Sequence, residues 1–296
     1  MPLADLPEFL LRRAYFSLPA VVAWYQRRKT RGLEAGAASA RWDPPALRRL
    51  LESEIPRGAD LMLHSSMAGL GASTSPQDVL DSFLEFCRGD LLIPSHPRLR
   101  AGLDGVLEYD PRRAPSTVGL VSELARRAAG FQRSRHPISA VAVRGPAAAF
   151  YLENNLNESR PLPHGVDSPY ARLAERGGYA VCLGVPFDKC LTMIHVSEET
   201  LDAAFPRAIR FDELRVRVLE AGGDSTWTVR VRSRKMLPFV SMRQILRDLP
   251  AIGAVRRFTV GGTLVDIVDC GHVVRFMRER AADSGYPYVC LRRRSG

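Results

Sequence analysis

Apolar segments that alternate with helical patterns constrain the fold of this chain most strongly. The runs at 91–94 and 179–185 are almost wholly apolar, and the segments at 77–88 and 169–175 repeat apolar residues at helical spacing. Strands that are buried on both faces have such continuous apolar sequences because helices cover each face of their sheet. The sequence therefore predicts an α/β sandwich.

The remaining segments continue the alternation of strands and helices, and near the C-terminus β-hairpins are expected as well. Further strands are expected at 60–63 and 138–143, and further helices at 117–129, capped by Ser116, and at 147–152. The stretch 95–115, rich in Pro, Gly and Arg, predicts a loop. Two β-hairpins are expected, at 214–219 with 226–231 and at 257–260 with 263–268, followed by a helix at 273–282 and a strand at 288–291.

The length of 296 residues is near the upper limit for a single hydrophobic core. Residues 1–42 have helical character and include a small-residue linker at 35–40, so we expect a helical extension before a main domain at 43–296. Within it, segment 15–25 is apolar but too short to span a bilayer. It predicts either a helix packed on the domain or one in weak contact with a membrane surface.

Charge and cysteine content limit the class of protein. Lys and Arg number 42 against 32 Asp and Glu, a net charge of +10, which favours anionic ligands such as a phosphorylated cofactor. The arginines are dispersed rather than clustered, so no nucleic-acid partner is expected. The five cysteines form no C-x-x-C pair, which favours a reducing, cytoplasmic location.

Histidines beside small polar residues are the candidates for chemistry. His64, His136, His164 and His195 lie in loops or at element ends. His195-x-x-Glu198 places two polar groups on one helix face, as an acid/base pair or as metal ligands, but the metalloprotease pattern H-E-x-x-H is missing. No metal is expected. The sequence also lacks G-x-S-x-G, a P-loop and G-x-G-x-x-G.

The order of these motifs resembles the aminoglycoside 3-N-acetyltransferase family. The matching segments are HSS at 64–66, LLIPSH at 91–96, YDP at 109–111, PSTVG at 115–119, RSRHPISAVAVRG at 133–145, PHGVDSPYARL at 163–173, LGV at 183–185 and TMIHVSEE at 192–199. The resemblance covers roughly residues 45–285. It implies a three-layer α/β/α sandwich with a mixed central sheet, and an N-acyltransferase that uses acetyl-CoA or another acyl-CoA.

The resemblance also implies roles for individual residues. It assigns catalysis to His195 with Glu198, and to His164 and Asp188 beside them. It assigns the cofactor to Ser65 and Ser66 near the pantetheine, and to Arg133, Ser134, His136 and Ser139. It assigns the acceptor to His64, Ser168 and Thr192. Either Arg133 or Arg135 is expected to bind the anionic nucleotide end of coenzyme A.

The chemistry of amide formation needs few groups. An imidazole poised near neutral pH can take the proton of the attacking amine, and His195 oriented by Glu198 is the first candidate, with His164 as the alternative. The oxyanion needs donors, for which the backbone N–H groups at 65–66 or a hydroxyl are candidates.

The chain departs from the family pattern at 186–192. This segment is one residue longer than usual and lacks an Asn, so the acceptor pocket is expected to differ, with Asp188 keeping the acidic role. The small-molecule acceptor is expected to be an amino sugar or an aminoglycoside-like amine, and the basic charge favours a neutral or anionic one. A catalytically reduced binding or scaffold protein on the same fold is the alternative. The oligomeric state stays open.

Overall fold

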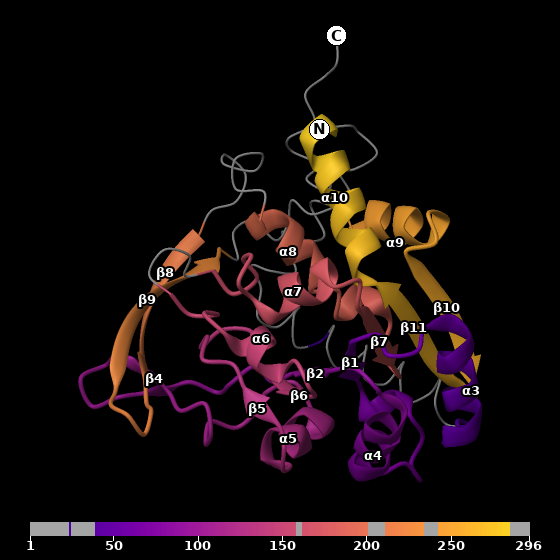
Figure 1. Ribbon diagram of the computed structural model, residues 1–296, viewed down its shortest axis with the longest axis horizontal. Helices are drawn as coiled ribbons and strands as arrows, with labels where there is room; N and C mark the ends of the chain where they lie inside the picture. Colours follow the sequence, from indigo (N-terminus) through magenta and orange to yellow (C-terminus); the bar gives the residue numbers. More distant parts are fainter. Residues whose placement is uncertain (1–23, 25–38, 158–161, 201–210, 234–241, 285–296) are drawn as a thin grey trace.

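The computed structural model describes residues 24, 39–157, 162–200, 211–233 and 242–284. Its central element is a seven-stranded sheet with the order β10-β11-β7-β1-β2-β6-β5 (Figure 1). The three inner strands, β1 (Leu61–Ser65), β2 (Leu91–Pro94) and β7 (Tyr179–Leu183), run in parallel. Antiparallel strands flank them on both sides, so the sheet is mixed.

The outer strands complete this sheet. They are β5 (Gln132–Arg133), β6 (Val141–Arg144), β10 (Val255–Val260) and β11 (Thr263–Asp269). The last two form the second predicted hairpin, pairing from Val255 with Val268 to Val260 with Thr263. This hairpin joins the central sheet through the antiparallel pair β11 and β7.

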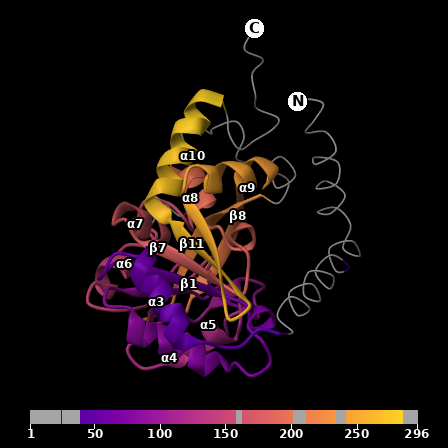
Figure 2. The same ribbon diagram turned by 90° about the vertical axis from the view of Figure 1, so that its right-hand side faces the viewer.

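Two helical layers cover the sheet, which confirms the three-layer prediction. One layer contains α3 (Pro44–Glu54), α4 (Pro76–Phe86) and α5 (Leu120–Arg127). The other contains α6 (Ala148–Leu152), α7 (Pro169–Glu175), α8 (Met193–Thr200), α9 (Met242–Ala251) and α10 (Cys270–Ser284). Figure 2 shows the first layer below the sheet, and α8, α9 and α10 above it.

The alternation of side chains in β1 shows why the apolar runs lie in the sheet. Leu61 and Leu63 pack in the hydrophobic cluster with α3, α4 and α5, whereas Met62 packs in the cluster on the opposite face. Successive side chains of a strand point to opposite faces, so a strand between two helical layers needs apolar residues at every position.

Local capping explains where two of the helices begin. Ser75 and Asp78 form a reciprocal capping box at the start of α4, and Ser168 accepts the N–H of Ala171 at the start of α7. In both helices a proline follows the cap, at a position where its missing N–H costs no hydrogen bond.

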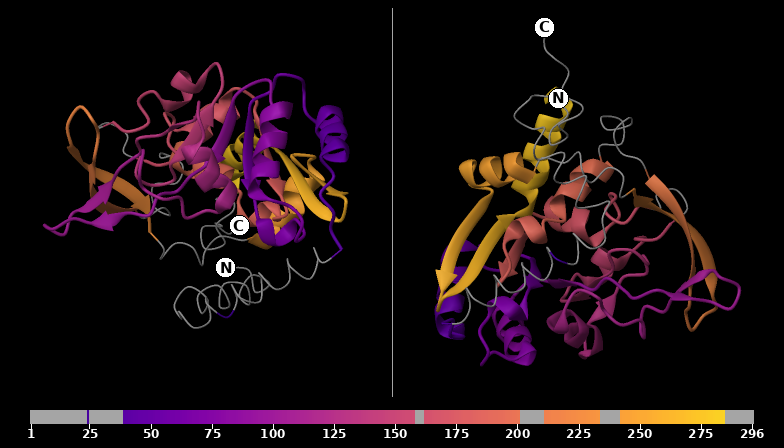
Figure 3. Two further views of the ribbon diagram at one scale, coloured as in Figure 1. Left: turned by 90° about the horizontal axis from the view of Figure 1, so that it is seen from below. Right: turned by 180° about the vertical axis from the view of Figure 1, so that it is seen from behind.

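A smaller four-stranded sheet lies beside the central one (Figure 3). It contains β3 (Arg100–Ala101), β4 (Leu107–Tyr109), β8 (Phe211–Val218) and β9 (Ser225–Arg232), in this order. The pair β8 and β9 is the first predicted hairpin. The buried hydroxyl of Tyr109 donates to the carbonyl of Ser134 at 2.7 Å and ties this sheet to the main body.

The segment 95–115 was expected to be a loop, and that expectation is wrong in part. It contains β3 and β4, and β4 pairs in parallel with β8, which lies more than 100 residues later in the chain. Strands of two or three residues show no periodicity, so local sequence does not reveal them.

Two predicted element boundaries are also wrong. α5 begins after Gly119 rather than at Ser116, because Ser116 forms a bridge with Pro97 and the Thr117 N–H donates to the His96 carbonyl, which keeps this segment extended. The strand predicted at 138–143 begins only at Val141, since Ser139 has a positive φ of 51°.

Several predictions fall outside the described residues. They are the helical extension apart from its last residues and Trp24, most of the segment 15–25, and the strand at 288–291. The division at residue 43 stays a prediction, although Asp43 caps α3 there. Within the described ranges, no helix is both long enough and apolar enough to cross a membrane.

Candidate active site

The carboxyl ends of β1, β2 and β7 meet at one edge of the central sheet, where a cavity of about 760 Å³ opens. In parallel sheets, ligands bind at this edge because loops from neighbouring strands converge there. A volume in this range is typical of sites for small molecules. Seven predicted site residues line the cavity: His64, Ser65, Ser139, His164, Asp188, Thr192 and His195.

His195 lies in α8, three residues before Glu198, and the two side chains face each other as predicted. Nδ1 of His195 is 2.9 Å from Oε2 of Glu198, whose side chain is only 1% exposed. The buried carboxylate therefore lies behind the imidazole and does not line the cavity. A proton on Nδ1 would leave the other ring nitrogen, Nε2, as the basic atom.

Arg232, from β9 of the smaller sheet, is a third member of this group that the sequence analysis missed. Its Nη2 is 3.0 Å from Oε1 of Glu198, and its Nη1 is 3.0 Å from Nδ1 of His195. Its side chain is 11% exposed and lines the cavity. No local pattern connects Arg232 with His195, because the contact depends on how the two sheets pack.

Burial lowers the pKa of His195 below its usual value, and this is the largest effect on the ring. The carboxylate of Glu198 opposes the shift, while the positive charges of Arg232 and of a protonated His164 strengthen it. The net lowering keeps the imidazole neutral at pH 7, the state that can accept a proton.

His164 repeats the arrangement of His195 with a different glutamate. Its Nδ1 lies 2.9 Å from Oε1 of Glu199, and its backbone N–H donates to Oε2 of the same carboxylate at 2.6 Å. The rings of His164 and His195 are 5.2 Å apart between centroids. Consecutive glutamates in α8 therefore hold two neighbouring imidazoles in the cavity.

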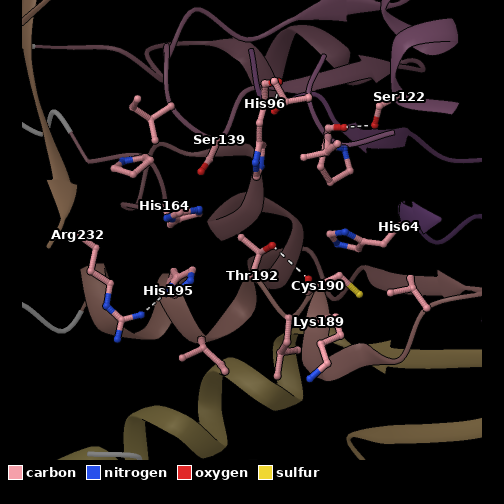
Figure 4. Close-up of a pocket in the computed structure, with 18 of the residues that line it drawn as sticks. His64, His96, Ser122, Ser139, His164, Lys189, Cys190, Thr192, His195 and Arg232 are labelled. Carbon is pink, nitrogen blue, oxygen red and sulfur yellow. Dashed lines mark hydrogen bonds between the residues drawn. The ribbon is translucent and has the colours of Figure 1, made fainter. Parts of the chain in front are cut away.

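His96 is a fourth histidine of the cavity, which three of the four predicted site histidines also line. His96 lies just after the apolar residues of β2, and His64 lies just after those of β1. This shared position at the end of an apolar strand is the sequence signal that could have identified His96. The following labelled side chains surround one space in Figure 4: His64, His96, Ser139, His164 and His195.

His64 and His96 differ from the other pair because neither faces a carboxylate in the contacts described. Nε2 of His96 lies 3.2 Å from the hydroxyl of Tyr170. Burial lowers the pKa of His64 to about 4 and that of His96 to about 3. Both rings are neutral at pH 7 and contribute polar atoms without charge.

Asp188 lies in a one-turn helix, η3 (Phe187–Lys189), and lines the cavity. The buried carboxylate of Asp266 fixes this turn by accepting the N–H of Phe187 at 2.8 Å. Asp188 itself forms an ion pair with Lys189 at 2.5 Å. A lysine thus lies directly against the predicted acidic residue.

Several predicted cofactor residues do not line the cavity. The N–H of Ser66 donates to the Leu183 carbonyl at 3.0 Å, so it is engaged within the sheet edge rather than directed at an oxyanion. The hydroxyl of Ser134 accepts the Val141 N–H at 2.9 Å. The buried ring of His136 faces the backbone of Ile138. Their roles with the cofactor stay predictions.

The two arginines expected at the nucleotide end of coenzyme A are engaged elsewhere in the protein. The guanidinium of Arg133 donates to the carbonyls of Ser95 and Ala114 and lies over the ring of Tyr109. Arg135 forms a two-point ion pair with Glu220, at 2.7 and 2.8 Å. Neither arginine is among the residues that line the cavity.

Two residues that were predicted to bind the acceptor amine form hydrogen bonds with the backbone. Ser168 is the buried N-cap of α7 and does not reach the cavity. Thr192 lines the cavity, and its hydroxyl donates to the Cys190 carbonyl at 3.3 Å just before α8 begins. Among the described residues, no group of three His, Cys, Asp or Glu side chains could hold a metal ion.

Comparisons of this chain with known proteins find relatives of one family. The family model described as aminoglycoside 3-N-acetyltransferase matches residues 62–282. Aminoglycoside N(3)-acetyltransferase VIII of Streptomyces fradiae is 32% identical over 183 residues, which are 57% of this chain and 60% of that relative. Aminoglycoside N(3)-acetyltransferase IX of Micromonospora chalcea is 28% identical over 253 residues, 74% of this chain and 85% of that relative.

Solved structures confirm the fold. Aminoglycoside acetyltransferase AAC(3)-Xa superposes with a TM-score of 0.71 at 23% identity, covering 87% of this chain and 98% of that one. AAC-IIIb in its binary structure with CoASH gives 0.68 at 20% identity, covering 80% and 95%. The family model spans most of the chain and the fold agrees over at least 80% of it, so the resemblance seen in the sequence is confirmed: the chain belongs to the aminoglycoside 3-N-acetyltransferase family.

Proposed function

We propose that the protein transfers an acyl group from acetyl-CoA, or another acyl-CoA, to a primary amine of an amino sugar or an aminoglycoside-like acceptor. The observation that carries this proposal is the His195 imidazole, which lines the cavity and is backed by a buried carboxylate. Relatives support the substrate classes: AAC-IIIb has been solved with CoASH and AAC-VIa with sisomicin.

The cavity fits the reacting end of an acyl-CoA. Apolar side chains, among them Leu63, Val118 and Ile138, line it together with a few polar groups. Such a lining suits an extended chain whose amides and thioester need only isolated hydrogen bonds. The co-substrate would supply the thioester, whose carbonyl carbon bonds to the amine nitrogen as the carbon–sulfur bond breaks.

His195 acts in this proposal as the general base. Glu198 accepts a hydrogen bond from the Nδ1–H of His195, which leaves the lone pair on Nε2 free to act as the base. Nε2 takes the proton that the amine loses on attack and returns it to the departing thiolate. A neutral ring is required, and the lowered pKa of His195 provides it.

Arg232 and Glu198 both lie close to Nδ1 of His195, so they decide between them which ring nitrogen carries the proton. If the guanidinium donated to Nδ1, the proton of the ring would lie on Nε2 and no base would face the acceptor. The ion pair between Arg232 and Glu198 instead holds Glu198 ionised, and an ionised carboxylate favours the proton on Nδ1.

Ser139 is our candidate for the oxyanion donor. Its side chain lines the cavity, and its positive φ of 51° is a conformation that serine seldom adopts. Strain of this kind persists where surrounding structure imposes it, which is common at functional sites. The loop of Ser139 therefore replaces Ser66 as the source of a donor.

Calorimetry with acetyl-CoA and free coenzyme A, followed by thiol release with a panel of amines, tests the function. We expect micromolar binding to the wild type and to His195→Ala, with thiol release only in the wild type. Absence of coenzyme A binding in both proteins would contradict the acyltransferase proposal. Binding without thiol release for any amine would favour the reduced binding protein. We also propose that the protein is cytoplasmic and uses no metal ion.

A further inference from the structure

The charges of the cavity are arranged in pairs. Asp188 faces Lys189 at 2.5 Å, Glu199 faces His164 at 2.9 Å, and Glu198, behind the wall, faces Arg232 at 3.0 Å. These are the carboxylates that line or directly support the cavity among the residues described. Each of them already has a positively charged or hydrogen-bonding partner within the protein.

This pairing matters for an acceptor with several ammonium groups. Each ammonium loses water when it enters a cavity, and only a carboxylate with spare acceptor capacity compensates for that loss. Glu199 uses both oxygens on His164, one for the ring and one for the backbone N–H. Glu198 divides its oxygens between His195 and Arg232.

Asp188 also lines the cavity, and its carboxylate forms an ion pair with the ammonium of Lys189, which lines the cavity too. The side chain of Asp188 is 10% exposed, whereas that of Lys189 is 31% exposed. The ammonium is the more exposed partner of this pair, and it competes with an incoming cation for the Asp188 carboxylate. The guanidinium of Arg232 adds a second fixed positive charge to the wall, and the net charge of +10 repels polycations at longer range.

From this arrangement we infer that the acceptor is a monoamine whose remaining groups are neutral or anionic, and that Lys189 excludes polycationic amines by neutralising Asp188. The inference rests on the proposed function for the identity of the site, but it concerns binding and can be measured without turnover. It sets this chain apart from relatives such as AAC-VIa, which has been solved with sisomicin.

Equilibrium binding of three amines tests the inference: glucosamine 6-phosphate, glucosamine and kanamycin, each added to the protein saturated with free coenzyme A. We expect the first or second to bind at least tenfold more tightly than kanamycin at low salt. Lys189→Gln should improve kanamycin binding about tenfold, because it removes the ammonium that is paired with Asp188. Lys189→Arg keeps the charge and should leave kanamycin binding weak.

A charge-matched control separates the local effect from the overall charge. Arg127→Gln also removes one positive charge, from an exposed side chain of α5 that pairs with Glu123 outside the cavity, and should leave all three affinities unchanged. If Lys189→Gln and Arg127→Gln improved kanamycin binding equally, the proposed role of Lys189 would be overturned. Tighter binding of kanamycin than of both glucosamines would overturn the acceptor class. Loss of coenzyme A binding in the wild type would instead contradict the proposed function.

Discussion

Arg232 and Glu198 form an ion pair that joins the smaller sheet to helix α8, with Nη2 3.0 Å from Oε1. The same guanidinium lies 3.0 Å from Nδ1 of His195 through its other terminal nitrogen. The protonation state of the proposed base therefore depends on a strand outside the central sheet. This contact gives β9 a chemical role besides its packing.

Replacing Arg232 should move the acidic limb of the pH profile. The positive charge of Arg232 helps to lower the pKa of His195, and the base works only when neutral, so kcat/KM falls as pH drops through that pKa. Arg232→Gln removes the charge, raises the pKa and shifts the limb to higher pH. Profiles of kcat/KM between pH 5 and 9, with protein-only thermal melts, measure the effect.

Arg232→Lys serves as the matched variant for this experiment. It keeps the positive charge, so its acidic limb should lie near that of the wild type. Breaking a buried ion pair costs about 3 kcal/mol, which is why the melts are needed. If Arg232→Gln folds and its profile coincides with that of the wild type, Arg232 does not influence the base.

Substitution by Asn distinguishes the roles of His195 and His164, the two histidines that are hydrogen-bonded to glutamates. His195→Asn should lower kcat by about 100- to 10,000-fold, the usual contribution of a general base, and leave acetyl-CoA binding intact. His164→Asn should mainly raise KM for the amine, because His164 lies beside the base at 5.2 Å between ring centroids. Steady-state kinetics with saturating acetyl-CoA measure both. The reverse pattern would assign the base to His164.

Local sequence predicted the parts of the fold that have local causes. The buried strands at 91–94 and 179–183 were evident because helices on both faces require apolar side chains throughout. His195 and Glu198 were evident because three residues separate groups on one helix face. Contacts between distant parts of the chain were not predicted. Arg232 of β9 contacts α8, and β4 pairs with a strand about 100 residues later in the sequence.

Buried neutral histidines should make the protein sensitive to acid. Burial lowers the pKa values of His64 and His96 to about 4 and about 3, below about 6.5 in an unfolded chain. Between these values the unfolded state binds more protons, so stability decreases as pH falls from 6.5 toward 4. Each ring contributes at most about 1.4 kcal/mol per pH unit.

Urea unfolding at pH 7.5, 6.5, 5.5 and 4.5 measures this dependence. His64→Gln should flatten the slope, because glutamine does not titrate and is similar in size and polarity. A variant with an unchanged slope would show that His64 is accessible to protons in the folded state.

Arg133 offers a separate test of the predicted cofactor contact. Its guanidinium donates to the carbonyls of Ser95 and Ala114, and hydrogen bonds from charged donors contribute roughly 1.5–3 kcal/mol. Arg133→Gln should therefore lower the melting temperature by several degrees and change the Kd of coenzyme A little at temperatures where it is folded. A weaker Kd with an unchanged melting temperature would instead support direct cofactor binding.

The close approach of Gly69 and Gly184 should make the contact between the loop after β1 and the end of β7 intolerant of side chains. A Cβ at Gly69 would overlap the backbone carbonyl of Gly184, which follows β7 with a φ of 65°. Because the Gly184 carbonyl is backbone and cannot turn away, Gly69→Ala should cost about 3 kcal/mol, the upper end of the usual range for overpacking. Gly222→Ala is the matched control, since no heavy atom lies within 4 Å of its Cβ. Urea unfolding of the two variants should differ by this amount, and equal stabilities would show that the loop after β1 can move away from β7.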